Sequence, residues 1–277
     1  MQTCSIILSG GLSRRFQVPG EPYLDKALYL IDGKPMISRA YEAAVAVSND
    51  VVIAINDWIK ASIYGNFLRA RFVMDEEPRG PLGGIAAGLR ACGGDVALIL
   101  PNDMPYITGN ALMHLLDAVK DSDVATFILP NGALEAVMAI KVPPGIKLID
   151  LMRRWGRSKV TDIYRALPVV SLLNASRRGV ARQLINVNSR EDIVPREVGD
   201  DLASGDILMR RRFDLELRGP DLDKSLWGTL SSGDPWSEAR FYAENGALFL
   251  AAHALIDSIN PNVKAMGNII LRKLKSQ

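Results

Sequence analysis

The stretch TCSIILSGGLSRR, residues 3–15, decides the fold. Its first half is a short and nearly continuous apolar run, which is typical of a strand covered on both faces of a parallel sheet. Its second half is a glycine pair followed by two arginines. Paired glycines let main-chain N–H groups approach a phosphate or a base, and arginine neutralises the charge of a phosphate. The stretch therefore predicts a buried strand leading into a loop for an anionic ligand, with a tight structural turn as the alternative.

Similar apolar runs recur along the first two thirds of the chain and alternate with amphipathic stretches. The further strands are expected at 51–55, 71–74, 96–100, 124–129, 134–141, 167–173 and 184–187, and the helices at 36–48, 58–70, 84–91, 110–120 and 146–157. This alternation indicates βαβ units around a mostly parallel sheet, hence an α/β fold. Right-handed crossovers bring the loops after the strands to one edge of the sheet, where open α/β folds bind ligands.

The last part of the chain has a different character, which divides the protein into 1–198 and a small, mainly helical appendage, 199–277. Two helices are expected in the appendage, at 236–259 and 263–274. The triplet Arg210-Arg211-Arg212 has acidic neighbours, so a solvated loop is favoured over a nucleic-acid site.

Composition excludes several classes of protein. The 277 residues are 48% hydrophobic, and 33 basic against 31 acidic residues give a formal charge of +2, which argues against a nucleic-acid or membrane-surface binder. The only two cysteines, Cys4 and Cys92, offer no disulfide framework and no metal-ligand spacing, so buried free thiols are expected. With no signal-peptide pattern and no apolar run of spanning length, a cytoplasmic location is expected.

Two more loops at the same expected edge carry chemistry. Residues 80–84, GPLGG, precede a helix whose first N–H groups would be free to bind an anion. Residues 100–105, LPNDMP, hold Asp103 between two prolines at a strand end, as suits a Mg²⁺ ligand. A packing turn and a helix cap are the respective alternatives. Neither glycine cluster is a Walker loop or a dinucleotide fingerprint.

These motifs, and their order along the chain, resemble those of the molybdenum cofactor guanylyltransferases of the MobA-like nucleotidyltransferase superfamily. The resemblance covers about residues 1–195. The matching stretches are Leu8–Gly11, Arg15, Asp25-Lys26, 32–36, 80–84, 102–105 and 186–192. Glu135-Ala136-Val137 stands where that family usually has His-Pro or Glu-Pro. The chain departs from the family at Arg15-Phe16-Gln17, usually Arg-Met-Gly, and in a longer loop before Asp25.

The resemblance implies a three-layer α/β/α nucleotide-diphospho-sugar transferase fold with a mixed, mostly parallel seven-stranded sheet. It also implies roles for individual residues. Lys26, Arg15 and Asp103 would be catalytic, and Asp103 would bind Mg²⁺. The substrate-binding residues would be Leu8, Gly10, Gly11, Lys26, Asp75, Gly80, Pro81, Leu82, Gly83, Asn186 and Asn188.

The activity implied is transfer of GMP from GTP to the phosphate of molybdopterin, with release of pyrophosphate. Open alternatives are a guanylyl- or cytidylyltransferase for cobinamide phosphate, a sugar phosphate or an alditol phosphate, and a nucleotide-binding sensor without turnover. The C-terminal helices are candidates for a homodimer contact or for docking a partner of the same pathway. The basic segment 147–159 is interpreted as a solvated helix face, with an acceptor site as the alternative, and His253 as a core or interface residue.

Overall fold

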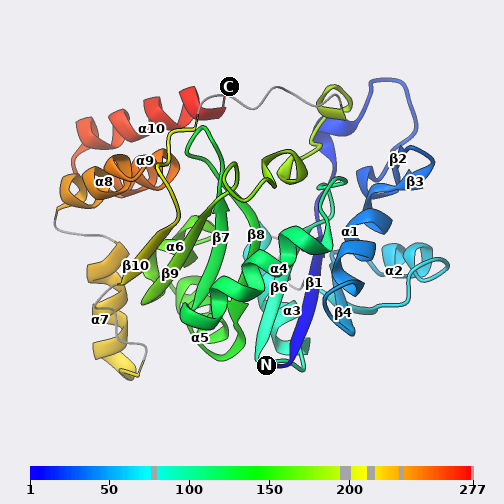
Figure 1. Cartoon of the computed structure of the whole chain (residues 1–277), viewed down its shortest axis with the longest axis horizontal. Coiled ribbons are helices and arrows are strands. Elements are labelled where there is room, and N and C mark those ends of the chain that lie inside the picture. Colours follow the sequence, from blue (N-terminus) through cyan, green and yellow to red (C-terminus); the bar gives the residue numbers. More distant parts are fainter. Residues whose placement is uncertain (76–79, 194–200, 211–215, 231–233, 276–277) are drawn as a thin grey trace.

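The computed structural model describes residues 1–75, 80–193, 201–210, 216–230 and 234–275, and its centre is an eight-stranded mixed sheet (Figure 1). The strand order is β10-β9-β7-β8-β6-β1-β4-β5. Six of the strands run in one direction, and β8 and β10 run antiparallel to their neighbours. The bounds are β1 Thr3–Ser9, β4 Asp50–Ile55, β5 Arg71–Met74, β6 Val96–Pro101, β7 Val124–Ile128, β8 Leu134–Lys141, β9 Val169–Asn174 and β10 Ile207–Arg210. A two-stranded hairpin, β2 Leu30–Ile31 with β3 Lys34–Pro35, stands apart from it.

Helices cover both faces of the sheet, as alternating side chains of the strands require. On one face lie α1 (Met36–Val45), α2 (Trp58–Tyr64) and α4 (Gly109–Ala118), and on the other lie α3 (Pro81–Ala91), α5 (Val142–Arg154) and α6 (Thr161–Ala166). In β1, Ile6 packs on the side of α3, and the next residue, Ile7, packs on the side of α1. The expected three-layer α/β/α fold is confirmed.

Two strand predictions were wrong. The resemblance implied seven strands, but β10, which lies beyond residue 198, pairs with β9 and adds an eighth. No strand forms at 184–187, because Leu184 ends a 3₁₀ turn (Ala181–Leu184) and the next residues leave the sheet. The Val187 N–H bonds to the carbonyl of Asp103 at 2.8 Å instead of to a neighbouring strand.

The C-terminal part is mainly helical, as expected, and the helix predicted at 263–274 is confirmed as α10, but the other helices differ from the prediction. They are α7 Gly219–Leu230, α8 Pro235–Glu244, α9 Leu248–Ile256 and α10 Pro261–Lys275. The single helix predicted at 236–259 is broken at Gly246, whose φ of 77° ends α8. A Cβ atom there would lie 2.5 Å from the carbonyl oxygen of Leu202, so the turn needs glycine. The predicted boundary at 198, and residues 211–212 of the arginine triplet, lie outside the described residues.

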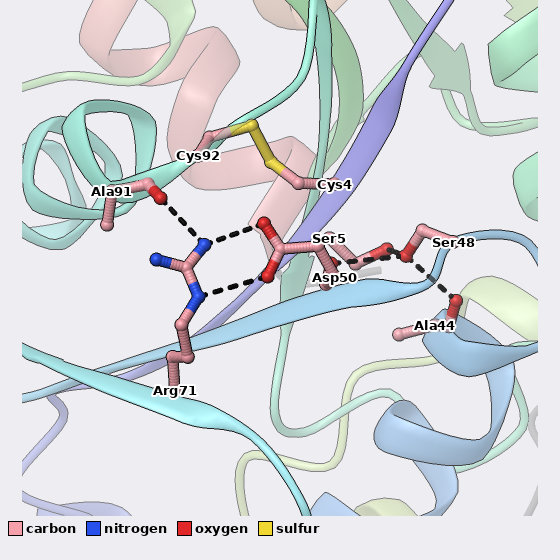
Figure 2. The surroundings of a disulfide bond; sticks show 8 residues. All are labelled: Cys4, Ser5, Ala44, Ser48, Asp50, Arg71, Ala91 and Cys92. Atoms are coloured by element: carbon pink, nitrogen blue, oxygen red, sulfur yellow. Dashed lines mark hydrogen bonds and ion pairs between the residues drawn. A yellow bond between two sulfur atoms is a disulfide. The ribbon is translucent and has the colours of Figure 1, made fainter.

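The two cysteines are not free thiols, which corrects the sequence-based expectation. Cys4 on β1 and Cys92, directly after α3, form a disulfide with their Cα atoms 5.8 Å apart (Figure 2). Arg71 of β5 fixes the same helix end, because its guanidinium donates to the Ala91 carbonyl at 2.7 Å and to the Asp50 carboxylate. The pair is 88 residues apart in sequence, so only the packing of α3 on β1 brings it together.

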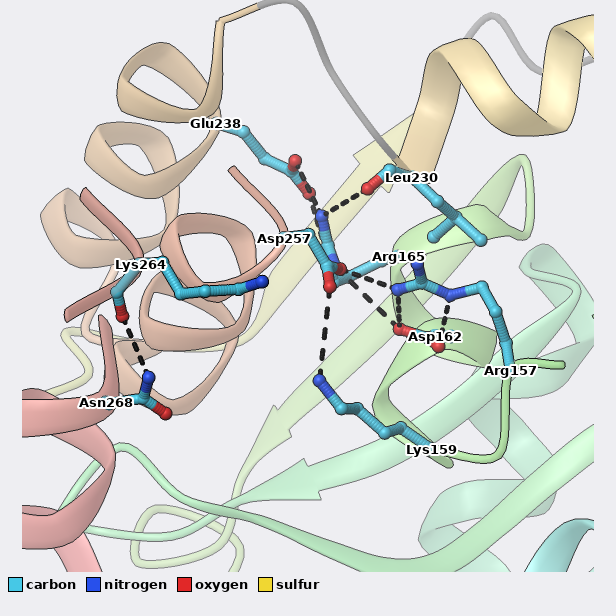
Figure 3. Close-up of polar contacts among 9 residues, drawn as sticks. All are labelled: Arg157, Lys159, Asp162, Arg165, Leu230, Glu238, Asp257, Lys264 and Asn268. Carbon is cyan, nitrogen blue, oxygen red and sulfur yellow. Dashed lines mark hydrogen bonds and ion pairs between the residues drawn. The ribbon is translucent and has the colours of Figure 1, made fainter. Parts of the chain in front are cut away.

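A buried cluster of charges joins the C-terminal helices to α6 (Figure 3). We call it the clamp, and it consists of Arg157, Asp162, Arg165, Glu238 and Asp257. The Arg165 guanidinium is 1% exposed and donates to both carboxylate oxygens of Glu238, to Asp257 and to the Leu230 carbonyl. Arg157 donates to Asp162 and to Asp257.

Through the described part of the chain, every helix is too short or too polar to cross a bilayer.

Candidate active site

A cleft of about 670 Å³ opens at the carboxyl ends of β1, β4, β5 and β6. It lies where the strand order changes sides: β4 and β5 follow on one side of β1, and β6 returns to the other side. Open α/β sheets bind ligands at such a switch point. The cleft is therefore where the connectivity alone would place a site.

The loop after β1 forms one wall of the cleft with Gly10 and Gly11. A Cβ atom on Gly10 would lie 3.5 Å from Oδ2 of Asp75 and 3.8 Å from Cβ of Asn56. These are ordinary van der Waals distances, so the loop lies directly against the residues that follow β4 and β5. Asn56 Oδ1 is buried and has no hydrogen-bond partner among the described residues.

The amino end of α3 forms the facing wall. Gly80 precedes the helix with φ 91° and ψ −172°, a conformation that side chains other than glycine rarely adopt. Pro81 occupies the first turn, where its missing N–H costs nothing. Both residues line the cleft, so the positive end of the α3 dipole faces it.

Lys26 and Asp103 meet at the floor of the cleft, where the Lys26 ammonium bonds to Oδ2 of Asp103. Asp25 holds Lys26 in place by capping the 3₁₀ turn Lys26–Leu28, with its carboxylate accepting from the N–H of Ala27. Gln17 closes the longer loop between Arg15 and Asp25, because its amide bonds to Ser13 O at 2.9 Å and Leu24 O at 2.8 Å. The added residues therefore do not displace Lys26 from the cleft.

The second oxygen of Asp103 fits a metal ion. Oδ1 is buried and, among the described residues, has no hydrogen-bond partner. No group of three or more acidic, histidine or cysteine side chains with metal-ligand geometry occurs in the described ranges. Mg²⁺ commonly binds through one or two carboxylates, several waters and substrate phosphates, so a single aspartate suits it better than it suits zinc or calcium.

The loop after residue 185 packs against the Asp103 loop, where the Val187 N–H bonds to the Asp103 carbonyl. Asn188 lines the cleft and accepts a hydrogen bond from Arg15 at 3.1 Å. Asn186 instead turns away and donates to the Glu135 carboxylate. Burial raises the pKa of Glu135 to about 8, although the bond from Asn186 acts in the opposite direction.

Most of the site residues expected from the sequence come together in this cleft. Those that line it are Leu8, Gly10, Gly11, Arg15, Lys26, Asp75, Gly80, Pro81, Asp103 and Asn188. Leu82 is buried in the core, Gly83 faces a neighbouring cavity that also touches Asp75, and Asn186 contacts Glu135. Residues 76–79, which the sequence places beside the second glycine cluster, lie outside the described residues.

Asn56 lines the cleft but was not predicted from the sequence. Asn56 directly follows β4, so the rule that pointed to Gly10 and Asp103 could have found it. Ala54 of β4 was not predicted either, whereas the rest of the lining, Leu12, Ser13, Arg14, Gly84, Pro101, Asn102 and Ala136, lies in stretches that the sequence motifs had singled out. The basic segment 147–159 contributes no side chain to the described lining of the cleft.

Comparisons with known proteins agree with this geometry. A molybdenum cofactor guanylyltransferase from Desulfosudis oleivorans is 27% identical over 68% of this chain and 91% of its own length. A probable molybdenum cofactor guanylyltransferase from Aquifex aeolicus is 34% identical over 70% of this chain and 89% of its own length.

Solved structures show the same fold. Molybdopterin-guanine dinucleotide biosynthesis protein A from Archaeoglobus fulgidus superposes with a TM-score of 0.56 at 21% identity, covering 69% of this chain and 94% of that one. The family model of the MobA-like NTP transferase domain matches residues 5–187, which include every residue named above for the two walls and the floor of the cleft. The chain therefore belongs to the MobA-like NTP transferases, a family of nucleotidyltransferases.

Proposed function

We propose that the protein transfers GMP from GTP to the phosphate of molybdopterin and releases pyrophosphate in a Mg²⁺-dependent reaction. The observation that carries the proposal is the convergence of Lys26, Asp103 and two anion-binding backbone segments on one cleft. The names of the two relatives described above support guanine as the base and molybdopterin as the acceptor.

The cleft matches the chemistry of nucleotidyl transfer. The acceptor phosphate attacks the α-phosphorus of the triphosphate, the bond to the β-phosphate breaks, and pyrophosphate leaves. A phosphate monoester is anionic near neutral pH, so the reaction needs positioning and charge neutralisation more than a strong base. Lys26 and Arg15 supply positive charge at the cleft, and the glycine loop and the α3 terminus supply N–H donors.

Mg²⁺, when bound, would neutralise charge on the phosphate oxygens. Asp103 would hold it through Oδ1, while Oδ2 remains on the Lys26 ammonium. Lys26 thereby orients the carboxylate as well as contributing its own charge. Asn188 accepts a hydrogen bond from Arg15 and would help to hold the acceptor.

Oxygen acceptors beside the glycine loop favour guanine. Asn56 Oδ1 has no described partner, and Asn56 and the Asp75 carboxylate both lie within 4 Å of the position that a Cβ atom on Gly10 would take. Guanine presents two neighbouring donors, N1–H and the 2-amino group, which need such oxygens. Adenine and cytosine carry an acceptor where guanine carries N1–H, and an acceptor would face an oxygen unfavourably.

Thermal unfolding with GTP, CTP, ATP or UTP and Mg²⁺ tests the base. A ligand at about 100 times its Kd adds about 2.7 kcal/mol of stability, so GTP is expected to raise the Tm most. Pyrophosphate release on adding molybdopterin then tests the acceptor. Stabilisation by CTP alone would replace guanylyl by cytidylyl transfer, and stabilisation by GTP without turnover on any phosphorylated acceptor would indicate a sensor.

A further inference from the structure

Lys60 is a buried lysine for which the proposed reaction has no direct use. It lies on α2, which is outside the cleft, and only 9% of the residue is exposed. Burial lowers the pKa of its ammonium, and the Asp25 carboxylate opposes that effect. Burying a lysine costs free energy unless its donors are satisfied, so its partners indicate what it does.

Those partners are the main-chain carbonyls of the glycine loop. The Lys60 ammonium donates to Ser9 O at 2.7 Å and to Gly11 O at 3.1 Å, and it lies 3.8 Å from Oδ2 of Asp25. In a trans peptide the N–H of the next residue points opposite to the C=O. The N–H groups of Gly10 and Leu12 therefore point away from Lys60, and both residues line the cleft.

The same helix contacts the Lys26 turn directly and is linked to the Asp103 loop through Ser9. The Tyr64 hydroxyl donates to Asp25, which caps the turn carrying Lys26, and it lies 3.0 Å from Oγ of Ser9. Asn102, next to Asp103, donates to the same Oγ at 2.8 Å. Helix α2 thus joins the glycine loop, the Lys26 turn and the Asp103 loop from behind.

We propose that Lys60 is a positioning residue for nucleotide phosphates: by holding the carbonyls of Ser9 and Gly11 behind the loop, it presents the opposite N–H groups to the phosphates and places a positive charge behind them. This inference rests on the proposed function, since it assumes a nucleoside triphosphate in the cleft. It assigns to α2 a role in binding phosphate and none in recognising the base.

The test compares a ligand that has phosphates with one that lacks them. Lys60→Met keeps the length of the stem and removes the charge and the donors. We expect GTP to bind about tenfold more weakly to it, because two charge-assisted hydrogen bonds that shape the loop are lost, and guanosine to bind as it does to the wild type. In pyrophosphate release, KM for GTP rises about tenfold and KM for the acceptor stays constant.

Two further variants test whether the loss of affinity comes from the charge and the donors of Lys60. Lys60→Gln removes the charge but keeps a donor that reaches one carbonyl, and its GTP affinity is expected between those of the wild type and Lys60→Met. Lys120→Met is the matched control, because Lys120 is exposed, pairs with Asp117 and lies on the segment after α4. It should bind both ligands as the wild type does.

Specific outcomes overturn the inference. If Lys60→Met and Lys60→Gln bind GTP as tightly as the wild type, Lys60 does not position phosphates. If guanosine and GTP weaken by the same factor, the role is a general structural one and the inference is again wrong. A wild-type protein that binds none of the four triphosphates would overturn the proposed function, and this inference with it.

Discussion

The cleft and the clamp both bury charged side chains, but they satisfy them to different degrees. In the clamp, Arg165 has a carboxylate or carbonyl partner for each of its three nitrogens. In the cleft, Asp103 Oδ1 and Asn56 Oδ1 have no partner among the described residues. Buried atoms without a described partner also occur beside the clamp, at Thr161 Oγ1 and His253 Nδ1, so the two atoms in the cleft point to a ligand because they lie at the switch point of the sheet. We therefore expect the clamp's charges to affect stability and the cleft's charges to affect ligand binding.

Removing Arg165 should have the largest effect. Arg165→Met leaves the buried Asp162 and the partly buried Glu238 and Asp257 with less compensating charge, and breaking such a cluster costs about 3–5 kcal/mol of unfolding free energy. Denaturant titration measures it. Because Arg165 is not part of the cleft lining, the folded variant should bind GTP with wild-type affinity. Arg240→Met, which removes an exposed arginine paired only along its own helix, is the control and should leave the midpoint unchanged. Unaltered stability of Arg165→Met would mean that the clamp does not hold the C-terminal helices.

Asp103→Asn should have the opposite effect to Arg165→Met: it should lower the activity and leave the stability unchanged. The amide keeps the size of the side chain and still accepts from Lys26, so the unfolding transition should stay near that of the wild type. Pyrophosphate release should fall on the order of 10²- to 10³-fold, about 3–4 kcal/mol of transition-state stabilisation, and lose its response to Mg²⁺. Asp117→Asn, at an exposed pair on α4, is the control. Wild-type turnover by Asp103→Asn would remove Asp103 from the metal assignment.

The sequence predicts the strands and the cleft well for a physical reason. The strands β5 and β8 match their predicted bounds, because each is a mostly apolar run whose charged residues lie at or near its ends. Gly10 and Asp103 were predicted from their place after strands, and connectivity alone brings such loops to one edge. Local pattern and global topology agree in these segments.

The remaining features depend on contacts between distant residues. Residues 184–187 are apolar except for Asn186, yet the Val187 N–H bonds to the Asp103 carbonyl and not to a neighbouring strand. Gly246 breaks a periodic helical pattern because it packs against Leu202. Lys60 occupies a position in an amphipathic helix where lysine usually faces solvent, so its burial under the glycine loop leaves no local signal. The Cys4–Cys92 disulfide likewise requires the packed sheet.

His253, buried beside the clamp, should make stability depend on pH. Burial, and then the charge of Lys159, lowers the pKa of His253 to about 4, against 6.5 without such surroundings; Arg165 acts in the same direction, and Asp162 and Asp257 oppose it. The unfolded chain therefore takes up a proton at a pH where the folded chain does not. Above pH 6.5 the titration of His253 does not change the free energy of unfolding. As the pH falls from 6.5 to 4, it lowers the free energy of unfolding by up to about 3 kcal/mol. His253→Leu removes this titration, so the unfolding free energies of variant and wild type, measured at pH 7 and 4.5, should differ in slope. Parallel slopes would show that His253 titrates normally.

The smallest effect is expected at Arg154, three residues before Arg157 of the clamp. The Arg154 side chain is 63% exposed and pairs with Asp223 at 3.3 Å, whereas that of Arg157 is 17% exposed and lies between Asp162 and Asp257. Because exposed ion pairs contribute only about 0–1 kcal/mol, Arg154→Glu should change the unfolding free energy by no more than about that amount. Arg154 also lies outside the cleft lining, so KM for the phosphorylated acceptor should stay constant in the pyrophosphate assay. A rise in that KM with an unchanged KM for GTP would instead assign the basic segment to the acceptor, and the contrast between a binding cleft and a structural clamp would then hold only for the nucleotide half of the reaction.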